Sequence, residues 1–575
     1  MRNQEVARIF NEIADILEIK GENPFRIRAY RRAARNIDGL TRDVAAMHEK
    51  ELLKIPGIGA DLAEKIREYV TTGTLKFYEE LKKEAPPGLA EILSVPGLGP
   101  RTAMLLFEKL KIKSIDDLQR YAEEGRLKGL PGIKERTEEN ILRGIAMIKR
   151  HSGRFPLGRV LPVAEEIMSE LRKRSPVREL VAAGSLRRWK DTIKDIDILS
   201  TSRDPEKVMD VFVHLPLARE VLMKGPTKSS IVTGEGIQVD LRVVSEDSFG
   251  SALAYFTGSR AHNIRIRELA VKKGLKINEY GIFDVRTGKK LGGRRESDVF
   301  KILGLPFIPP EIREDAGEIE AALENALPRL VDTGDIKGDL HVHSNYSDGS
   351  HSIQELAGIA EKKGYEYIAV TDHSKGLGVA RGMSIEQILQ QNKEIKDFNR
   401  KSERIKLLSG VEVDIRSDGA LDYPDEVLEK LDMVIASIHS GFRQSRRQLT
   451  GRLVSAMKNP CVTIIAHPTG RLIGERDAYD IDMEEVLKTA KETGTVLEIN
   501  AHPLRLDLND IHIKKAREMG ICMAVNTDAH TDFQFDFMHY GVRMARRGWL
   551  EKKDVLNALD RNRLMKHIKN KRAKR

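Results

Sequence analysis

Apolar and polar residues alternate along residues 195–199, which have the sequence Asp-Ile-Asp-Ile-Leu. This period of two predicts a β-strand with one buried face. Asp195 and Asp197 are two positions apart, so their carboxylates project from the same face of the strand. Residues 238–244 form a second strand-like run that carries Asp240, and residues 227–232 are expected to pair with it. The pattern therefore predicts three carboxylates clustered on one sheet.

Such a cluster, together with the turn that precedes it, suits phosphoryl-transfer chemistry. Hard divalent cations prefer oxygen ligands, and two of them roughly 3.5–4 Å apart can hold both the attacking and the leaving oxygen of a displacement at phosphorus. The turn at residues 184–190, Gly-Ser-Leu-Arg-Arg-Trp-Lys, offers backbone N–H groups, the hydroxyl of Ser185 and the guanidinium of Arg188 to the phosphates of a nucleotide. An isolated Asp-x-Asp pair is more often part of a solvated strand, but the turn, the spacing and the third aspartate together favour a metal site.

This combination of a Gly-Ser turn, an Asp-x-Asp pair ten residues past the serine and a later strand aspartate resembles the catalytic palm of family X DNA polymerases, the group of DNA polymerase beta. The resemblance implies that Asp195 and Asp197 bind two Mg²⁺ or Mn²⁺ ions. It also implies that Asp240 binds the catalytic ion and helps to activate the primer 3′-OH. The residues implied to hold the triphosphate of an incoming dNTP are Gly184, Ser185 and Arg188.

Residues 255–267 extend the resemblance. Their sequence, Tyr-Phe-Thr-Gly-Ser-Arg-Ala-His-Asn-Ile-Arg-Ile-Arg, is close to the family's Tyr-Phe-Thr-Gly-Ser signature. The resemblance implies that Tyr255, Phe256 and Gly258 lie beside the sugar of the incoming nucleotide. Asn263 and Arg267 are one turn apart on the helix that follows, so they share a face. By the same resemblance, these two residues contact the minor groove of the nascent base pair. Every base pair presents the same hydrogen-bond acceptors there, so such contacts check the geometry of the pair and do not read its sequence.

Two Pro-Gly-x-Gly hairpins occur near the N-terminus, in residues 55–66 and 95–106, and residues 130–137 form a weaker third copy with Lys134 in place of the second glycine. One copy would be typical of an ordinary turn between packed helices, but two spaced copies resemble helix-hairpin-helix motifs. Glycine lets the hairpin backbone approach a DNA phosphate, and N–H groups at the start of the next helix face the anion. Such contacts position DNA without reading its sequence. The glycines expected to contact DNA are Gly57, Gly59, Gly97 and Gly99.

Residues 1–80 resemble the small N-terminal domain of the polymerase beta group. That domain grips the 5′ phosphate of a gap and can carry a 5′-deoxyribose-phosphate lyase lysine, and Lys65 falls on the matching position. A lyase forms its Schiff base through a neutral amine, whereas Asp61, one helical turn away, stabilises the charged ammonium. A lyase lysine and a helix-surface lysine therefore both stay open.

From about residue 337 onward, apolar runs alternate with amphipathic helices such as residues 352–363 and 482–493. This alternation predicts a (β/α) barrel, which carries its chemistry at the carboxyl ends of the strands. Of the 15 histidines, 11 lie in this part of the chain, and ligand-type side chains recur where apolar runs end. Imidazole with carboxylate suits zinc, manganese or iron, and nine such ligands can hold about three metals. The nine candidates are His341, His343, Asp348, His373, Glu412, His439, His467, Asp528 and His530.

These nine positions resemble the ligands of the PHP (polymerase and histidinol phosphatase) domain, a distorted (β/α)7 barrel. The resemblance implies about three divalent metals, Mn²⁺ or Zn²⁺, and metal-activated water that attacks a phosphate ester. In bacterial and archaeal family X polymerases this domain resembles a 3′–5′ exonuclease that also processes 3′ ends. A small-molecule phosphatase and a structural metal module are the alternatives. Further candidates for steering the substrate phosphate are Arg443, Arg471 and Asn500.

The composition of the chain predicts that it binds a polyanion. The chain has 575 residues, which suggests about three or four domains, and a net charge of +10 from 97 Lys and Arg against 87 Asp and Glu. It has no run of about 18 apolar residues, so no membrane span is expected. With two cysteines, no disulfide framework is expected and the protein is predicted to be cytoplasmic. Residues 1–10 are expected to form an amphipathic helix, and the basic tail, residues 566–575, to be disordered and to add nonspecific DNA affinity.

The resulting hypothesis is a monomeric multidomain enzyme of α+β and α/β class that fills short gaps in DNA during base excision repair and processes 3′ ends. Its partners are gapped or primer–template DNA and dNTPs. A non-catalytic scaffold that binds DNA ends is the alternative of another class. The predicted segments are a small helical gap-binding domain (1–80), a helix-hairpin-helix subdomain (81–150), a palm with a mixed β-sheet (151–242), a nascent-base-pair-binding subdomain (243–316), a linker (317–336) and the PHP barrel (337–575).

Overall fold

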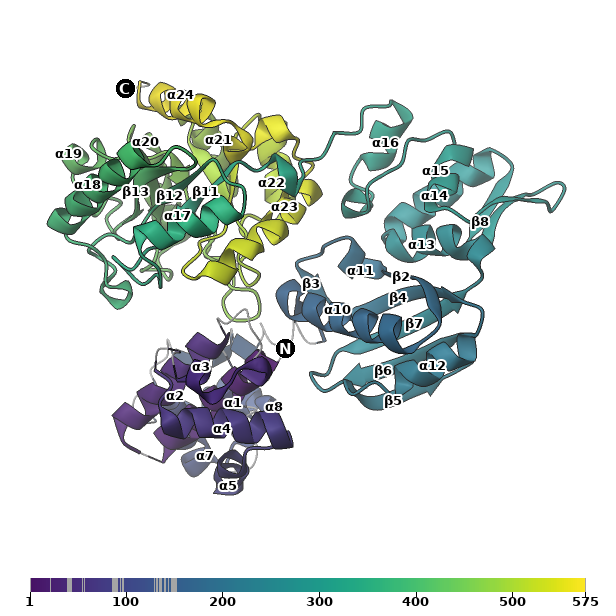
Figure 1. Ribbon diagram of the computed structural model, residues 1–575, viewed down its shortest axis with the longest axis horizontal. Coiled ribbons are helices and arrows are strands. Elements are labelled where there is room, and N and C mark those ends of the chain that lie inside the picture. Colours follow the sequence, from purple (N-terminus) through teal and green to yellow (C-terminus); the bar gives the residue numbers. More distant parts are fainter. Residues whose placement is uncertain are drawn as a thin grey trace. The chain divides into compact units, whose positions relative to one another are not determined.

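The computed structural model divides into two compact units, one of residues 1–152 and 474–476 and one of residues 153–473 and 477–575 (Figure 1). Each unit is described by itself. The residues that the structure describes are 2–20, 22–38, 44–53, 55, 57–84, 92–93, 95, 98–128, 130, 133, 137–138, 141–142, 144–145 and 153–573. None of the described helices has an apolar stretch long enough to cross a membrane.

The first unit is helical where it is described. It has two apolar cores, one built mainly from α1, α2 and α4 and the other around α7 and α8. The expected N-terminal amphipathic helix is present as α1, whose apolar side chains lie in the first core. The long helices are α1 (Arg2–Ile19), α2 (Pro24–Asp38), α4 (Ala60–Thr72), α5 (Lys76–Glu84), α7 (Pro100–Leu110) and α8 (Ile115–Glu123).

The second unit begins with the palm, a mixed five-stranded sheet in the order β2-β4-β7-β6-β5. β4 pairs in parallel with β7, and the other pairs are antiparallel, including the predicted pairing of β6 with the Asp240 strand. Helices α10 (Leu157–Arg174) and α12 (Pro205–Val213) pack their apolar sides on this sheet and contact each other. The strands are β2 (Val177–Ala182), β4 (Asp195–Ser202), β5 (Ala218–Lys224), β6 (Lys228–Thr233) and β7 (Gln238–Val244).

A smaller subdomain follows, with helices packed against a three-stranded antiparallel sheet in the order β10-β9-β8. Ser259 caps the N-terminus of α14 by accepting a hydrogen bond from the His262 N–H, which fixes the turn between α13 and α14. The elements are α13 (Phe249–Thr257), α14 (Arg260–Lys272), β8 (Leu275–Asn278), β9 (Gly281–Asp284), β10 (Lys290–Gly292), α15 (Glu296–Ile302) and α16 (Glu318–Leu323).

The C-terminal part is a seven-stranded parallel sheet in sequential order from β11 to β17. A parallel bridge between Val342 and Ala529 brings the two edges together, so the sheet closes almost fully into the predicted barrel. The barrel runs from green to yellow in Figure 1, with its helices outside the strands. Its strands are β11 (Gly338–Val342), β12 (Tyr367–Val370), β13 (Lys406–Asp414), β14 (Met433–Ser437), β15 (Ile464–Ile465), β16 (Val496–Asn500) and β17 (Met523–Asn526). The longer helices are α17 (Ile353–Lys362), α18 (Ile385–Lys401), α20 (Arg446–Lys458), α21 (Met483–Thr493), α22 (Asp510–Glu518), α23 (Met538–Arg547) and α24 (Arg561–Arg572).

The basic C-terminal tail is a helix and not a disordered segment. Leu564 and Ile568, one turn apart on α24, are buried among the apolar side chains at one end of the barrel. Lys571 Nζ donates to the Met457 carbonyl at 3.0 Å. The prediction of disorder is therefore wrong over residues 566–572, because a narrow apolar stripe within the basic sequence docks on the barrel.

Candidate active sites

The three palm aspartates lie on one face of two neighbouring strands. β4 and β7 run in parallel with Asp197 opposite Asp240 and Asp195 opposite Gln238. Along both strands the carboxylate positions are half-buried, while Ile196, Ile198, Val239 and Leu241 between them are fully buried in the core. The alternation seen in the sequence therefore places all three carboxylates together, as predicted.

The crowding of these carboxylates is electrostatically costly without a cation. Burial, followed by the negative charges of Asp195 and Asp240, raises the pKa of Asp197 to about 6. Asp240 is held by two neighbours, since Gln238 Nε2 donates to its Oδ1 at 3.0 Å and Lys228 Nζ lies 3.7 Å from its Oδ2. Divalent cations would remove the repulsion among the three carboxylates, so the oxygen-rich set fits hard metal ions.

The Gly-Ser turn packs directly on Asp197. Gly184 has a φ of +61° and opens α11 (Gly184–Arg187), and a Cβ at this position would lie 2.4 Å from Asp197 Oδ2. The Ala183 N–H donates to the Asp197 carbonyl at 2.8 Å. Only glycine fits this close approach, which places the half-buried Ser185 beside the carboxylate cluster.

Two arginines bind the same turn to the end of α13. Arg187 Nη1 donates to Thr257 Oγ1 at 2.7 Å, and its guanidinium forms a bidentate ion pair with Glu296 at 2.6 and 2.7 Å. Arg188 Nη1 donates to the Thr257 carbonyl at 2.8 Å and its Nε donates to Glu314 Oε1 at 2.9 Å. The turn and the Tyr-Phe-Thr-Gly-Ser segment, 70 residues apart in the chain, are therefore joined in one site.

The predicted nascent-base-pair residues also gather. Tyr255, Asn263 and Arg267 line one pocket. Asn263 Nδ2 donates to the carbonyls of Tyr255 and Gly258 at 2.7 and 3.2 Å, and a Cβ at Gly258 would lie 2.5 Å from Asn263 Oδ1. Phe256 packs edge-on against Tyr255, with ring centroids 5.2 Å apart. The glycine thus allows the amide of Asn263 to hold the backbone of the signature segment.

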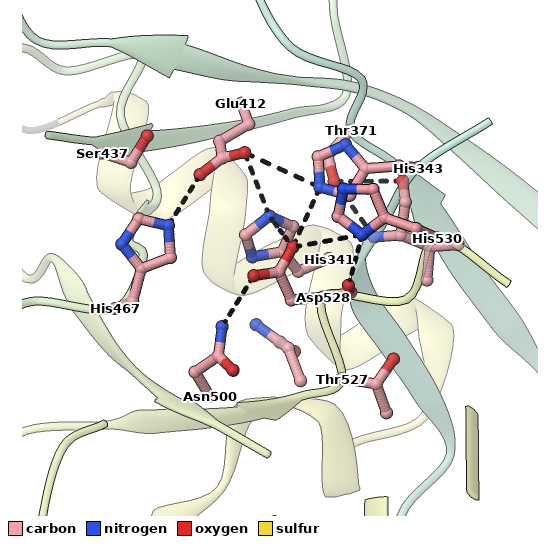
Figure 2. Close-up of polar contacts among 12 residues, drawn as sticks. His341, His343, Thr371, Glu412, Ser437, His467, Asn500, Thr527, Asp528 and His530 are labelled. Carbon is pink, nitrogen blue, oxygen red and sulfur yellow. Dashed lines mark hydrogen bonds and ion pairs between the residues drawn. The ribbon is translucent and has the colours of Figure 1, made fainter. Parts of the chain in front are cut away.

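All nine predicted barrel ligands meet at one end of the barrel. Figure 2 labels His341, His343, Glu412, His467, Asp528 and His530 there, with the carboxylates of Glu412 and Asp528 in contact with surrounding imidazoles. His341 and Glu412 lie on β11 and β13, and the remaining ligands follow the ends of β11, β12, β14, β15 and β17. Parallel strands deliver their carboxyl ends to the same side of a barrel, which explains the convergence.

The ligand atoms fall into three overlapping groups, each with its atoms within 4.8 Å of one another. His467 is in none of these groups, but its Nε2 lies 3.0 Å from Glu412 Oε1. The described part of the chain thus offers three overlapping candidate places for a metal ion. The groups are His343–Asp348–His373–His530, His341–His343–Asp528 and His373–Glu412–His439.

Orphaned buried atoms support this fit. His341 Nε2 and Glu412 Oε2 are buried, lie 3.4 Å apart and make no hydrogen bond of good geometry among the described residues, although Glu412 Oε2 is also 2.8 Å from His373 Nδ1 in an ion pair. Unpartnered buried polar atoms are costly, and a shared cation would satisfy both. The imidazole and carboxylate chemistry of the set suits a transition metal or zinc.

The electrostatics of the cluster favour the metal-binding form at some of these ligands and oppose it at others. Burial would lower the pKa of His439 and of His530, but the carboxylates of Glu412 and Asp348 beside them raise both pKa values to about 9, so a cation must displace a proton there. Burial, and then the neighbouring imidazoles of His530 and His373, lower the pKa of His343 to about 4, so its ring is neutral. Burial alone would raise the pKa of Glu412, but the charges of His439 and His373 outweigh it and hold that pKa well below the usual range. A neutral imidazole and an ionised carboxylate are the forms that coordinate metals.

Glu498, on β16, is a supporting residue that the sequence reasoning missed. Its carboxylate is fully buried and accepts hydrogen bonds from His341 Nδ1 at 2.8 Å, Asn526 Nδ2 at 2.9 Å and the His467 N–H at 2.7 Å. The bond to Nδ1 leaves His341 Nε2 to face the ligand cluster. A lone acid in the apolar run Val-Leu-Glu-Ile-Asn was the available signal.

Asp372 was also missed, although it adjoins His373. Its buried carboxylate accepts from the Ser344 N–H at 2.9 Å, the Ser347 N–H at 3.2 Å and Gln391 Nε2 at 2.5 Å. It therefore anchors the loop that carries the ligands at positions 343 and 348.

The three residues predicted to steer a substrate phosphate lie in different places. Asn500 lies at the cluster, where its Nδ2 donates to Asp528 Oδ2 at 3.1 Å, and Arg443 is exposed. Arg471 is taken up by structural contacts, donating to Asp191 Oδ2 at 2.9 Å and to the Arg505 carbonyl at 2.7 Å. The guanidinium beside the cluster belongs instead to Arg505, whose Nε is 3.7 Å from Asp528 Oδ2.

Two of the three described hairpin glycines, Gly59 and Gly99, leave the backbone open, whereas a Cβ at Gly57 would lie 2.9 Å from Arg32 Cδ. Gly57 has a φ of +84°. Gly59 and Gly99 cap the N-termini of α4 and α7, and a Cβ added at either position would meet nothing within 4 Å. Gly97 and the centre of the third hairpin lie outside the described residues. In the same unit the Lys65 ammonium pairs with the Asp61 carboxylate and lies 5.3 Å from the centre of the Phe77 ring.

Comparison with known protein families gives four matches, which lie in the N-terminal, central and C-terminal parts of the chain. Residues 1–75 match the helix-hairpin-helix domain family and residues 89–146 the SAM-like helix-hairpin-helix tandem family. Residues 252–314 match the DNA polymerase beta thumb family and residues 339–502 the PHP domain family.

Full-length and partial relatives agree with these matches. The chain is 41% identical to the DNA polymerase/3′-5′ exonuclease PolX of Bacillus subtilis, over 97% of this chain and 98% of that protein. It is 34% identical, over 41% of its length and 96% of the relative's, to a protein of Thermoanaerobacter pseudethanolicus named "Probable phosphatase". It is 25% identical to DNA polymerase lambda of Rattus norvegicus, over 54% of this chain and 56% of that protein. The chain therefore belongs to the family X DNA polymerases, with helix-hairpin-helix, polymerase beta thumb and PHP domains.

Proposed function

We propose that this polymerase fills short gaps in DNA during base excision repair, using dNTPs and two Mg²⁺ or Mn²⁺ ions at the palm. The observation that carries the proposal is the parallel pairing of β4 and β7, which sets Asp197 opposite Asp240 and leaves Asp195 on the same face. The N-terminal hairpins support a DNA substrate, because Gly59 and Gly99 leave helix N-termini open to a phosphate.

In this proposal the metal ions supply charge neutralisation at the attacking and leaving oxygens. Asp195 and Asp197 would hold both ions, and Asp240 would hold the one that activates the primer 3′-OH. The contacts from Gln238 and Lys228 keep the Asp240 carboxylate oriented before substrate arrives. The geometry is thus set in advance of the reaction, which is where most of the catalytic advantage of such sites lies.

The triphosphate is held by the turn that begins at Gly184, through Ser185 and Arg188. Tyr255, with Phe256 and Gly258 of the same segment, lies beside the sugar. Asn263 and Arg267, at the neighbouring pocket, check the minor groove of the new pair. None of these contacts distinguishes one base from another, which suits an enzyme that copies any template.

A 5′-labelled primer bordering a one-nucleotide gap with a 5′ phosphate tests the polymerase. Extension with Mn²⁺ and dNTPs is expected in the wild type. In Asp195→Ala it should fall by on the order of 10²–10³-fold or more, because the metal ions lose a shared ligand. Retained extension in that variant would refute the palm assignment. If the wild type neither extends nor shortens the primer, the scaffold hypothesis takes its place.

We propose that the barrel, holding about three Mn²⁺ or Zn²⁺ ions, is a 3′–5′ exonuclease that also processes 3′ ends. The nine converging ligands support a hydrolytic metal centre, and Asn500 and Arg505 offer donors to a substrate phosphate. The similarity to a protein named as a phosphatase, over nearly all of that protein, supports a second candidate, a small-molecule phosphatase.

His341→Ala separates these candidates. Primer shortening without dNTPs should be lost, while extension is kept because the palm has its own carboxylates. Phosphatase activity on a small phosphate monoester, lost in the same variant while the wild type never shortens a primer, would favour the second candidate.

Lys65 is a proposed lyase residue, supported by its place on α4 beside the hairpin glycines. Borohydride should trap a covalent adduct with a 5′-deoxyribose-phosphate end in the wild type and not in Lys65→Ala. Asp61→Asn, which removes the carboxylate that pairs with Lys65, should increase trapping because the amine is released from its ion pair to attack the sugar. Equal trapping in the wild type and in Lys65→Ala would remove Lys65 from the reaction.

A further inference from the structure

A buried arginine of the C-terminal barrel contacts the triphosphate turn of the palm. Arg547, at the end of α23, has a side chain only 1% exposed. Its Nη1 donates to the Arg188 carbonyl at 2.6 Å, and both Nη1 and Nη2 donate to Glu314 Oε1 at 3.2 Å. It also pairs with the carboxylate of Asp510 at the start of α22. A guanidinium is seldom buried this deeply unless its charge and its donors are matched, as they are here.

Glu314 is the centre of this contact. It accepts from Arg188 Nε at 2.9 Å and from Arg547, and Lys190 Nζ lies 3.5 Å from the same oxygen. Burial would raise the pKa of Glu314, but the positive charges of Arg188, Arg547 and Lys190 outweigh it and lower that pKa. Glu314 is therefore an ionised carboxylate shared by palm and barrel.

Arg188 is consequently fixed at three points. Its Nε is bound by Glu314, its Nη1 by the Thr257 carbonyl at 2.8 Å, and its own carbonyl by Arg547. Arg188 Nη2 donates no hydrogen bond to any of the described residues. The side chain is 11% exposed, so the guanidinium has one edge committed to the protein and a remaining edge for an anion.

We propose that Arg547 of the barrel is a positioning residue of the polymerase site, which holds the turn and neutralises Glu314 so that Arg188 is presented to the triphosphate. This inference rests on the proposed role of Arg188. Without Arg547, the Glu314 charge would be balanced mainly by Arg188. The incoming triphosphate would then compete with that ion pair for the same guanidinium, and the turn would lose an anchor on its backbone.

The expected consequence is a defect in nucleotide binding and not in chemistry. Among the described residues, Arg547 bonds the turn, Glu314, the Glu311 carbonyl and Asp510 but none of the three palm aspartates. Interactions that hold substrate and transition state alike change KM and leave kcat nearly unaltered. Arg547→Ala should raise KM for dNTP by roughly 10-fold or more, with kcat within about threefold.

The adjacent Arg546 provides a matched control. It lies on the same helix and ties the barrel to the same connecting segment, because its Nε donates to Glu311 Oε1 at 2.7 Å and its Nη1 to the Val331 carbonyl at 3.0 Å. Among the described residues, Arg546 forms no hydrogen bond or ion pair with the turn or with Glu314. Arg546→Ala therefore weakens the junction between palm and barrel without touching Arg188.

The test is single-nucleotide gap insertion by the full chain, with kcat and KM for dNTP measured for Arg547→Ala, Arg547→Lys, Arg546→Ala and Arg188→Ala. Arg547→Ala should show the KM increase, and Arg546→Ala should keep the wild-type KM. Lysine supplies the charge but only one nitrogen, so it cannot keep the pair with Asp510, made by Nη2, together with the Nη1 bonds to the Arg188 carbonyl and Glu314. Arg547→Lys should therefore rescue KM in part. Primer shortening without dNTPs should be unchanged in every variant, which reports an intact barrel.

The double variant Arg188→Ala/Arg547→Ala distinguishes positioning from general damage. If Arg547 acts through Arg188, its loss adds less than about twofold to KM once Arg188 is gone. A wild-type KM in Arg547→Ala, an equal rise in Arg546→Ala, or full additivity in the double variant would overturn the proposal. If Arg547→Ala does not fold, Arg547→Lys decides alone, since wild-type KM in that variant likewise overturns it. An unchanged KM in Arg188→Ala would refute the proposed role of Arg188 itself, which is a different result.

Discussion

Glu498→Gln is the sharpest test of how the barrel holds its metals. Both oxygens of the Glu498 carboxylate face only hydrogen-bond donors. Its Oε1 accepts from His341 Nδ1 and Asn526 Nδ2, and its Oε2 accepts from the His467 N–H and Asn500 Nδ2. Glutamine keeps the shape but must turn its NH₂ toward one of these pairs. Either orientation sets donor against donor in a fully buried place.

The cost can be worked from these four contacts. Two hydrogen bonds to a charged acceptor are lost, each worth about 1.5–3 kcal/mol, and the other two are weakened by the loss of charge. A histidine ligand that Glu498 orients is then misplaced or in the wrong tautomer. Loss of such a supporting partner typically lowers metal affinity about 10–100-fold, or about 1.4–2.7 kcal/mol.

The assay is calorimetric titration of the metal-free chain with Mn²⁺, with primer shortening measured in parallel. Glu394→Gln is the matched control, because Glu394 is a barrel glutamate that bonds Tyr346 Oη at 2.8 Å and Gln354 Nε2 at 2.9 Å and touches no ligand. Mn²⁺ affinity of Glu498→Gln within twofold of the wild type would refute the reasoning. So would an equal loss of affinity in the control.

Two further predictions address the palm and the C-terminal helix. Gly184→Ala should lower primer extension by on the order of 10²–10³-fold, because its Cβ would lie 2.4 Å from Asp197 Oδ2, whereas Gly274→Ala, at a similar φ of +69° but with open space around it, should keep near wild-type extension. Equal extension in the two variants would contradict the close-packing argument. Leu564→Ala should destabilise the barrel by about 2–5 kcal/mol and lower its Tm, while Lys566→Ala on the exposed face of the same helix should leave Tm within a degree or two; an unchanged Tm in Leu564→Ala would mean that α24 does not support the barrel.

Much of both sites could be predicted because their residues lie in regular local patterns. Strict alternation fixes the face on which Asp195 and Asp197 lie, and β/α alternation delivers ligands to the ends of parallel strands. The tail shows where local reasoning fails. Only Leu564 and Ile568 mark the buried stripe of its helix, and most of the surrounding residues are charged. The charged composition therefore predicted disorder, although these two apolar residues lie one helical turn apart.

The supporting residues were harder to find, because their role depends on what the fold brings to them. Glu498 is one acid in an apolar strand, and nothing nearby in sequence indicates that residues 341 and 467 will donate to it. Arg505 follows a strand by several residues and reaches the cluster only through the loop that Arg471 holds. Sequence spacing identifies ligands on strands, but not the partners that orient them.

The two active sites differ in how far each depends on the other half of the second unit. Every described hydrogen bond that orients the barrel ligands comes from the barrel itself, as with the carboxylates of Asp372 and Glu498. The palm turn, by contrast, has a barrel guanidinium, Arg547, buried against its backbone, and Asp191 at its end pairs with Arg471 of the barrel. Removing the Arg547 guanidinium would leave the Glu314 carboxylate with one positive neighbour fewer, and Glu314 lies beside Arg188. The polymerase site is therefore the one whose geometry requires both halves, while the metal centre is complete within its own barrel.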